Sequence, residues 1–99
     1  MFALVFTRSA QEELDRLEES PRDMGVVKQI KKTLGFLQTN PRHPSLQTHV
    51  FFSLQHPYSA HEKMCEAYVQ QQTPAACRLF WCYGPKRGQI TVIAITPHP

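Results

Sequence analysis

The 99-residue sequence lacks several motifs that would identify a common type of enzyme or metalloprotein. It contains no glycine-rich phosphate-binding loop, no Cys-x-x-Cys pair and no recognisable nucleophilic triad. His56, His61 and Cys65 are too loosely spaced for a structural zinc site, which prefers tight ligand pairs. We therefore expect neither a metal nor a cofactor.

Long apolar runs are also missing, so the sequence predicts no membrane span. The opening "MFALVF" is too short for a signal-peptide core and lacks a basic start. Three cysteines are an odd number, and Cys77 and Cys82 are five positions apart on one expected strand, facing opposite sides. Reduced thiols in a cytoplasmic protein are the expectation. The net charge of +3 permits an anionic partner without requiring one.

Two amphipathic helices are predicted in the first half of the chain. In residues 9–19, Ser9 and Glu12 have capping-box spacing, and the apolar stripe comprises Ala10, Leu14 and Leu17. The second helix is expected to begin with Ser20 as N-cap and Pro21 as first helical residue, and to end at Asn40 before Pro41. Its apolar positions are Val27, Ile30, Leu34 and Leu37.

Five β-prone segments are predicted to form strands. They span residues 2–6, 50–54, 63–70, 76–83 and 89–96, and the turn at 84–88 joins the last two as a hairpin. The order predicts an α+β fold in which two N-terminal helices pack on one face of a small, mainly antiparallel sheet. We expect one domain over residues 1–99.

Strand alternation predicts which side chains share the face that the helices leave open. That face would carry a carboxylate, an aromatic ring, a cation and an imidazole, from Glu66, Tyr68, Arg78 and His98. In the last strand, regular alternation groups Ile93 with Ile95 and sets them opposite Val92, Ala94 and Thr96. A single bulge would break this grouping.

The element order, the loop "NPRHPSL", the strand "CRLFW" and the ending "ITVIAITPHP" resemble the RelE/ParE superfamily of bacterial type II toxins. The resemblance implies a cognate antitoxin partner and a possible toxin-antitoxin hetero-oligomer. It also implies a metal-independent endoribonuclease that cleaves ribosome-bound mRNA and so inhibits translation. ParE-like inhibition of gyrase, or an inactive relative that only binds an antitoxin, are the alternatives.

Carried over residue by residue, the resemblance gives three catalytic candidates. Arg78 would stabilise the phosphorane, His98 would act as acid or base, and Glu66 would assist. Residues that would contact RNA are Arg42, His43, Lys63, Tyr68, Lys86 and Arg87. On this reading, Arg78 and His98 contribute little to folding.

Each catalytic candidate also has a structural interpretation. Arg78 and Glu66 would form a cross-sheet ion pair, and His98 would be a solvated side chain near the chain end. The basic residues outside the strands would be solvated loop charges. The sequence leaves these alternatives open.

Overall fold

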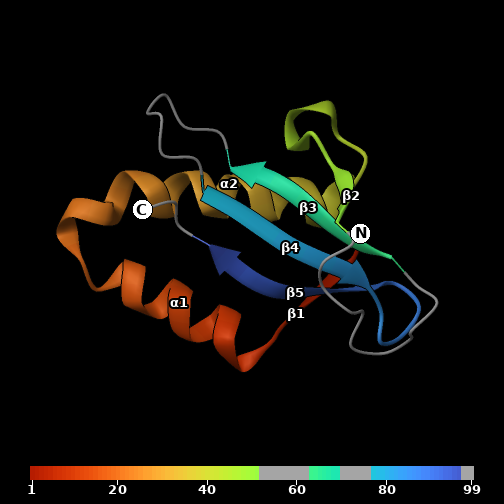
Figure 1. The fold of residues 1–99 in the computed structure, drawn as a ribbon, viewed down its shortest axis with the longest axis horizontal. Helices are drawn as coiled ribbons and strands as arrows, with labels where there is room; N and C mark the ends of the chain where they lie inside the picture. Colours follow the sequence, from red (N-terminus) through yellow and green to blue (C-terminus); the bar gives the residue numbers. More distant parts are fainter. Residues whose placement is uncertain (52–62, 70–76, 97–99) are drawn as a thin grey trace.

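The computed structural model describes residues 1–51, 63–69 and 77–96. In chain order, the elements are β1 (Ala3–Phe6), α1 (Arg8–Glu18), the 3₁₀ turn η1 (Pro21–Asp23), α2 (Met24–Thr39), the 3₁₀ turn η2 (Pro44–Leu46), β2 (His49–Phe51), β3 (Met64–Val69), β4 (Cys77–Tyr83) and β5 (Gln89–Thr96). The sheet order is β1-β5-β4-β3-β2. β1 runs parallel to β5, whereas the other neighbouring strands are antiparallel. Both helices lie on the same side of the sheet (Figure 1), which confirms the predicted α+β arrangement.

Helix α1 buries the predicted stripe of Ala10, Leu14 and Leu17, but its cap differs from the prediction. The N-cap is Thr7, whose hydroxyl accepts a hydrogen bond from the backbone N–H of Ala10 at 3.1 Å. Ser9 is already inside the helix, so the predicted capping box is wrong. Thr7 has the required extended backbone because it directly follows β1.

The second predicted helix is divided into two parts at its start. Ser20 precedes the 3₁₀ turn η1 rather than capping α2, and its side chain makes no capping hydrogen bond. Pro21 does occupy the first position of that turn, where a missing N–H costs nothing. The predicted end is confirmed, because Asn40 is extended at φ −158° and ψ 90° in front of Pro41.

The main core lies between the helices and the sheet. Its strand residues are Ala67, Val69, Cys77, Leu79, Trp81, Ile90, Val92 and Ile95. On the opposite face a second, smaller cluster buries Met64, Phe80 and Cys82. Cys77 and Cys82 therefore face opposite sides as predicted, and all three thiols are free. The sheet face opposite the helices, which the sequence predicts to be open, therefore also buries apolar side chains.

A β-bulge between β4 and β5 corrects the predicted alternation in the last strand. Phe80 pairs with Ala94, but the next residue, Trp81, pairs with Val92, so Ile93 is the extra residue. Ile95 consequently lies in the helix-side core, whereas Ile93 packs with Ala94 against the smaller cluster. The prediction that Ile93 and Ile95 share a face was wrong because regular alternation cannot anticipate the bulge.

The strand ends agree with the prediction to within one residue where they are described, since β1 and β3 each begin one residue later than predicted, at Ala3 and Met64. β5 has the predicted bounds, and residues 84–88 form the predicted hairpin turn, with Gly88 at φ +80°. β2 begins one residue early, at His49, and the predicted residues 52–54, 70 and 76 lie outside the described residues. In the described chain, no helix is long and apolar enough to cross a membrane.

Candidate functional site

The sheet face opposite the helices carries a buried carboxylate between two basic side chains. Glu66 lies on β3, and only 3% of its side chain is exposed. Arg78 on β4 donates from Nη1 to Glu66 Oε2 at 3.1 Å. The two residues are diagonal neighbours, because Arg78 pairs with Tyr68 and Glu66 pairs with Phe80. The sequence correctly placed Glu66, Tyr68 and Arg78 on one face.

His49 is the second partner of Glu66 and was missed at the sequence level. It stands directly opposite Glu66 on β2, and its Nε2 contacts Glu66 Oε1 in an ion-pair geometry. Its other ring nitrogen, Nδ1, lies 3.1 Å from the carbonyl oxygen of Gln47. Because both neighbours are acceptors, both hydrogen bonds form only when the imidazole carries two protons. Starting the second strand one residue earlier would have revealed His49.

The aromatic rings of Tyr68 and Phe80 lie beside the two basic side chains that flank Glu66. The Tyr68 ring lies 5.5 Å from the His49 ring, and the Arg78 guanidinium lies 5.9 Å from the centre of the Phe80 ring. Arg78 keeps 37% of its side chain exposed, and His49 keeps 47%. We call His49, Glu66, Tyr68 and Arg78 the carboxylate cluster. It combines an anchored cation and an imidazole, both accessible to a ligand.

The remaining predicted residues lie elsewhere. His98 is outside the described residues. Lys86 and Arg87 are exposed in the hairpin turn beyond Tyr83, and Tyr83 is five positions from Arg78, or about 17 Å along the strand. Lys63 is exposed immediately before β3. The hairpin charges therefore do not belong to the carboxylate cluster.

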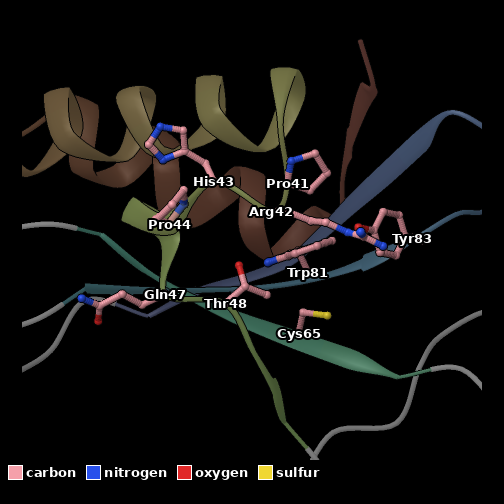
Figure 2. Close-up of a pocket in the computed structure, with 9 residues that line it drawn as sticks. All are labelled: Pro41, Arg42, His43, Pro44, Gln47, Thr48, Cys65, Trp81 and Tyr83. Atoms are coloured by element: carbon pink, nitrogen blue, oxygen red, sulfur yellow. The ribbon is translucent and has the colours of Figure 1, made fainter.

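Arg42 and His43 line a separate cleft of about 430 Å³ on the helix side of the sheet, together with Cys65, Trp81 and Tyr83 (Figure 2). The His43 ring stacks on Phe36 with 4.1 Å between centroids, and its Nδ1 accepts from the Ser45 backbone N–H. Strand alternation separates this cleft from the carboxylate cluster, because Cys65 and Glu66 are consecutive on β3.

Burial also governs the acidity of groups beside this cleft. It raises the pKa of the Cys65 thiol, whereas the nearby positive charge of Lys63 lowers it. It likewise raises the pKa of the Tyr83 phenol, which Cys65 raises further and Arg42 lowers. Among the described residues, no group of three or more histidine, cysteine or acidic side chains could hold a metal ion. Two of the loosely spaced metal candidates, His56 and His61, lie outside those residues.

Comparison with known proteins identifies the fold. No protein-family model and no curated protein matches the chain. A solved YoeB/ParE toxin from Agrobacterium tumefaciens superposes with a TM-score of 0.66 at 15% identity, covering 100% of both chains. The intact E. coli RelBE toxin-antitoxin complex gives a TM-score of 0.62 at 15% identity, covering 100% of this chain and 99% of that chain. The chain therefore has the fold of the RelE/YoeB/ParE-type toxins.

Proposed function

We propose that this chain, which has the fold of RelE/YoeB/ParE-type toxins, is the toxin of a toxin-antitoxin system and cleaves ribosome-bound mRNA without a metal. The carboxylate cluster is the observation that carries this proposal. It lies on the face opposite the helices and joins a cation, an imidazole and a buried carboxylate. The similarity to the RelBE complex supports an antitoxin partner and a hetero-oligomer, and the cytoplasm is the corresponding location.

Metal-independent RNA cleavage requires three chemical roles. The 2′-hydroxyl attacks the phosphate, so a base must accept its proton and an acid must protonate the leaving 5′-oxygen. Negative charge also accumulates on the phosphorane and needs a fixed donor. DNA lacks this hydroxyl and cannot react in the same way.

Arg78 suits the phosphorane-stabilising role. The bond to Glu66 uses Nη1, one of several N–H donors on the planar guanidinium. Among the described residues the guanidinium has no second hydrogen-bond acceptor, so its other donors are available there for phosphate oxygens. Because Glu66 is buried and holds one edge of the guanidinium, Arg78 is oriented before substrate binds. Preorganisation of this kind makes a single donor effective in the transition state.

The proton transfers fall to imidazoles rather than to Glu66. Both Glu66 oxygens are engaged, Oε2 by Arg78 and Oε1 by His49, so this carboxylate is suited to positioning its neighbours. His49 is the accessible imidazole of the cluster and would act as general acid from its doubly protonated form. His98 would supply the other proton transfer, as the acid or base that acts together with His49. Tyr68 and Lys63 would contact the RNA close to Glu66, whereas Arg42, His43, Lys86 and Arg87 would hold RNA away from the reacting phosphate.

The test is primer extension on translated mRNA with purified protein. Arg78→Ala should reduce cleavage by about 100-fold or more, the usual effect of removing a preorganised donor. Arg22→Ala is the matched control, because Arg22 is exposed in η1 and lies outside the cluster. It should cleave like the parent protein.

Three results would contradict the proposal. The first is cleavage by Arg78→Ala at the parental rate with an intact fold. The second is inhibition of gyrase supercoiling by a protein that cleaves no mRNA, which would favour the ParE-like function. Binding of an antitoxin with neither activity would identify an inactive relative.

A further inference from the structure

Acidic and basic residues are segregated along this chain. Six of the eight acidic residues occur in residues 12–23, and the other two are Glu62 and Glu66. Eight of the eleven lysines and arginines follow residue 23. Glu66 lies on the sheet face opposite the helices, where His49 and Arg78 pair with it. The part of the chain that follows η1 is therefore basic and attracts anions.

Two of these cations lie beside the cleft on the helix side of the sheet. Figure 2 shows the Arg42 side chain extending along the cleft toward the Tyr83 ring. Burial and the nearby Cys65 raise the pKa of the Tyr83 phenol, and the positive charge of Arg42 opposes this rise. Burial also raises the pKa of the Cys65 thiol, which the charge of Lys63 opposes. Both cations are thus close enough to act on groups in the wall of the cleft.

The aromatic wall of the cleft is accessible at Tyr83. This residue is 45% exposed, whereas the neighbouring Trp81 is 1% exposed. The Tyr83 ring is held by Phe2, with 5.8 Å between ring centroids, and by an edge contact with Trp81 at 5.1 Å. Tyr83 is therefore a fixed aromatic ring with exposed surface, on which a second planar ring can stack.

The loop that carries Arg42 is held in place as well. The backbone N–H of Arg42 donates to Asn40 Oδ1 at 3.1 Å, and that of His43 donates to the Asn40 carbonyl oxygen at 2.9 Å. The His43 ring stacks on Phe36. The cleft between this loop and the strands has a volume of about 430 Å³, within the range of small-molecule sites. A cation and an aromatic ring are thus positioned before a ligand arrives, which lowers the entropy lost on binding.

We propose that this cleft binds one unpaired nucleotide of an RNA strand, with the base stacked on Tyr83 and a phosphate paired with Arg42. An aromatic base next to a phosphate matches a fixed ring next to a guanidinium, a combination typical of single-strand binding. Lys86 and Arg87 lie in the turn that begins after Tyr83, so they contact phosphates of adjacent nucleotides. The choice of RNA as ligand rests on the proposed function, but the site is distinct from the carboxylate cluster, which lies on the opposite face of the sheet.

The experiment measures binding of a fluorescein-labelled 2′-O-methyl-uridine hexamer to the full chain by fluorescence anisotropy. This strand has no free 2′-hydroxyl, so the reaction proposed for the carboxylate cluster cannot occur during the measurement. We expect saturable binding by the parent protein. Tyr83→Leu should weaken it by about tenfold, as expected for the loss of one stacked base. Tyr83→Phe keeps the ring and should bind like the parent.

Arginine variants separate the cleft from a general attraction of RNA to a basic protein. Arg42→Gln should weaken binding and lower the slope of log Kd against log salt concentration by about 0.7, the effect of one phosphate contact on a single strand. Arg22→Gln removes the same charge from an exposed position in η1 and should leave affinity and slope unchanged. Because Arg42 is exposed, this comparison does not depend on how well the Tyr83 variants fold.

Parental affinity in a folded Tyr83→Leu variant, or an unchanged salt slope in Arg42→Gln, would overturn the proposal. Equal affinity for the hexamer in a duplex, or equally effective competition by hexaglutamate, would also overturn it, because neither ligand offers an unpaired base. The tenfold effect of Tyr83→Leu should persist in an Arg78→Ala background, whatever that background does to mRNA cleavage. Loss of the effect there would place the bound strand at the carboxylate cluster instead.

Discussion

The hydroxyl of Thr7 donates a hydrogen bond to the carbonyl oxygen of Ile93, 86 residues later in the chain, at 2.6 Å. The same hydroxyl accepts from the Ala10 N–H at the start of α1. Ile93 is the extra residue of the bulge in β5, so its carbonyl is outside the regular ladder with β4. The Thr7 side chain thus caps α1 and also donates a hydrogen bond to the carbonyl oxygen of the bulged residue in β5.

Thr7→Ala should lower the free energy of unfolding by about 1–2 kcal/mol, because both hydrogen bonds are lost. Urea denaturation is the measurement. Thr7→Ser should retain most of the stability, and Ser9→Ala should change it by less than about 0.5 kcal/mol. A larger loss for Ser9→Ala than for Thr7→Ala would contradict the assignment of the cap.

Arg78→Ala should also destabilise the protein, contrary to the sequence-level expectation that Arg78 contributes little to folding. The substitution removes a charge partner from a carboxylate that is 3% exposed. We expect a loss on the order of 2 kcal/mol, moderated because Arg78 itself is 37% exposed. Adding Glu66→Ala should recover part of that loss in a double-mutant cycle, and strictly additive losses would argue against coupling.

His49→Asn tests the proton-transfer role within the carboxylate cluster. Cleavage of ribosome-bound mRNA should fall by about 100-fold, and the limb of the pH–rate profile that requires protonated His49 should disappear. The melting temperature should be recorded for the same sample. An unchanged pH profile would leave His49 with only a positioning role and would return the proton transfer to His98.

Alkaline pH should destabilise the fold through its buried thiols. Burial raises the pKa of Cys77 and of Cys82 from 9.0 to about 11, so the folded state holds these protons more tightly than the unfolded state. Their stabilising contribution is complete below pH 9.0 and is lost as the pH rises through about 11. Melting temperature should therefore fall across this window, and less steeply in Cys82→Ala. If the melting temperatures of the parent and of Cys82→Ala fell equally steeply with pH, the buried thiol of Cys82 would not be the cause.

Replacing Gly35 or Gly88 with alanine should change the stability of the protein in opposite directions. Gly35 is exposed inside α2 with open space around the position of an added Cβ, so Gly35→Ala should stabilise by up to about 1 kcal/mol. Gly88 has φ +80° in the hairpin turn, and Gly88→Ala should destabilise by about 1 kcal/mol or more. Thermal melts of both variants provide the check. Stabilisation by Gly88→Ala would contradict the turn geometry.

The sequence alone determined the element order and most of the burial pattern. Helical spacing identified Ala10, Leu14 and Leu17 as the buried face of α1, and Pro41 predicted the end of α2. The turn residues at 84–88 predicted the final hairpin and the bounds of β5. These features depend on local spacing and backbone preference, which a single sequence displays directly.

Only the tertiary structure decided the features that join distant segments. Thr7 rather than Ser9 is the N-cap because β1 ends at Phe6 and α1 begins directly after Thr7. The bulge at Ile93 depends on how β5 pairs with β4. Strand alternation placed Glu66 and Arg78 on one face, but the contact of His49 with Glu66 required the register of β2 against β3. The cleft beside Trp81 likewise requires the loop after α2 to pack near β3 and β4. Local preferences cannot specify these contacts, because each is set by the relative position of elements far apart in the chain.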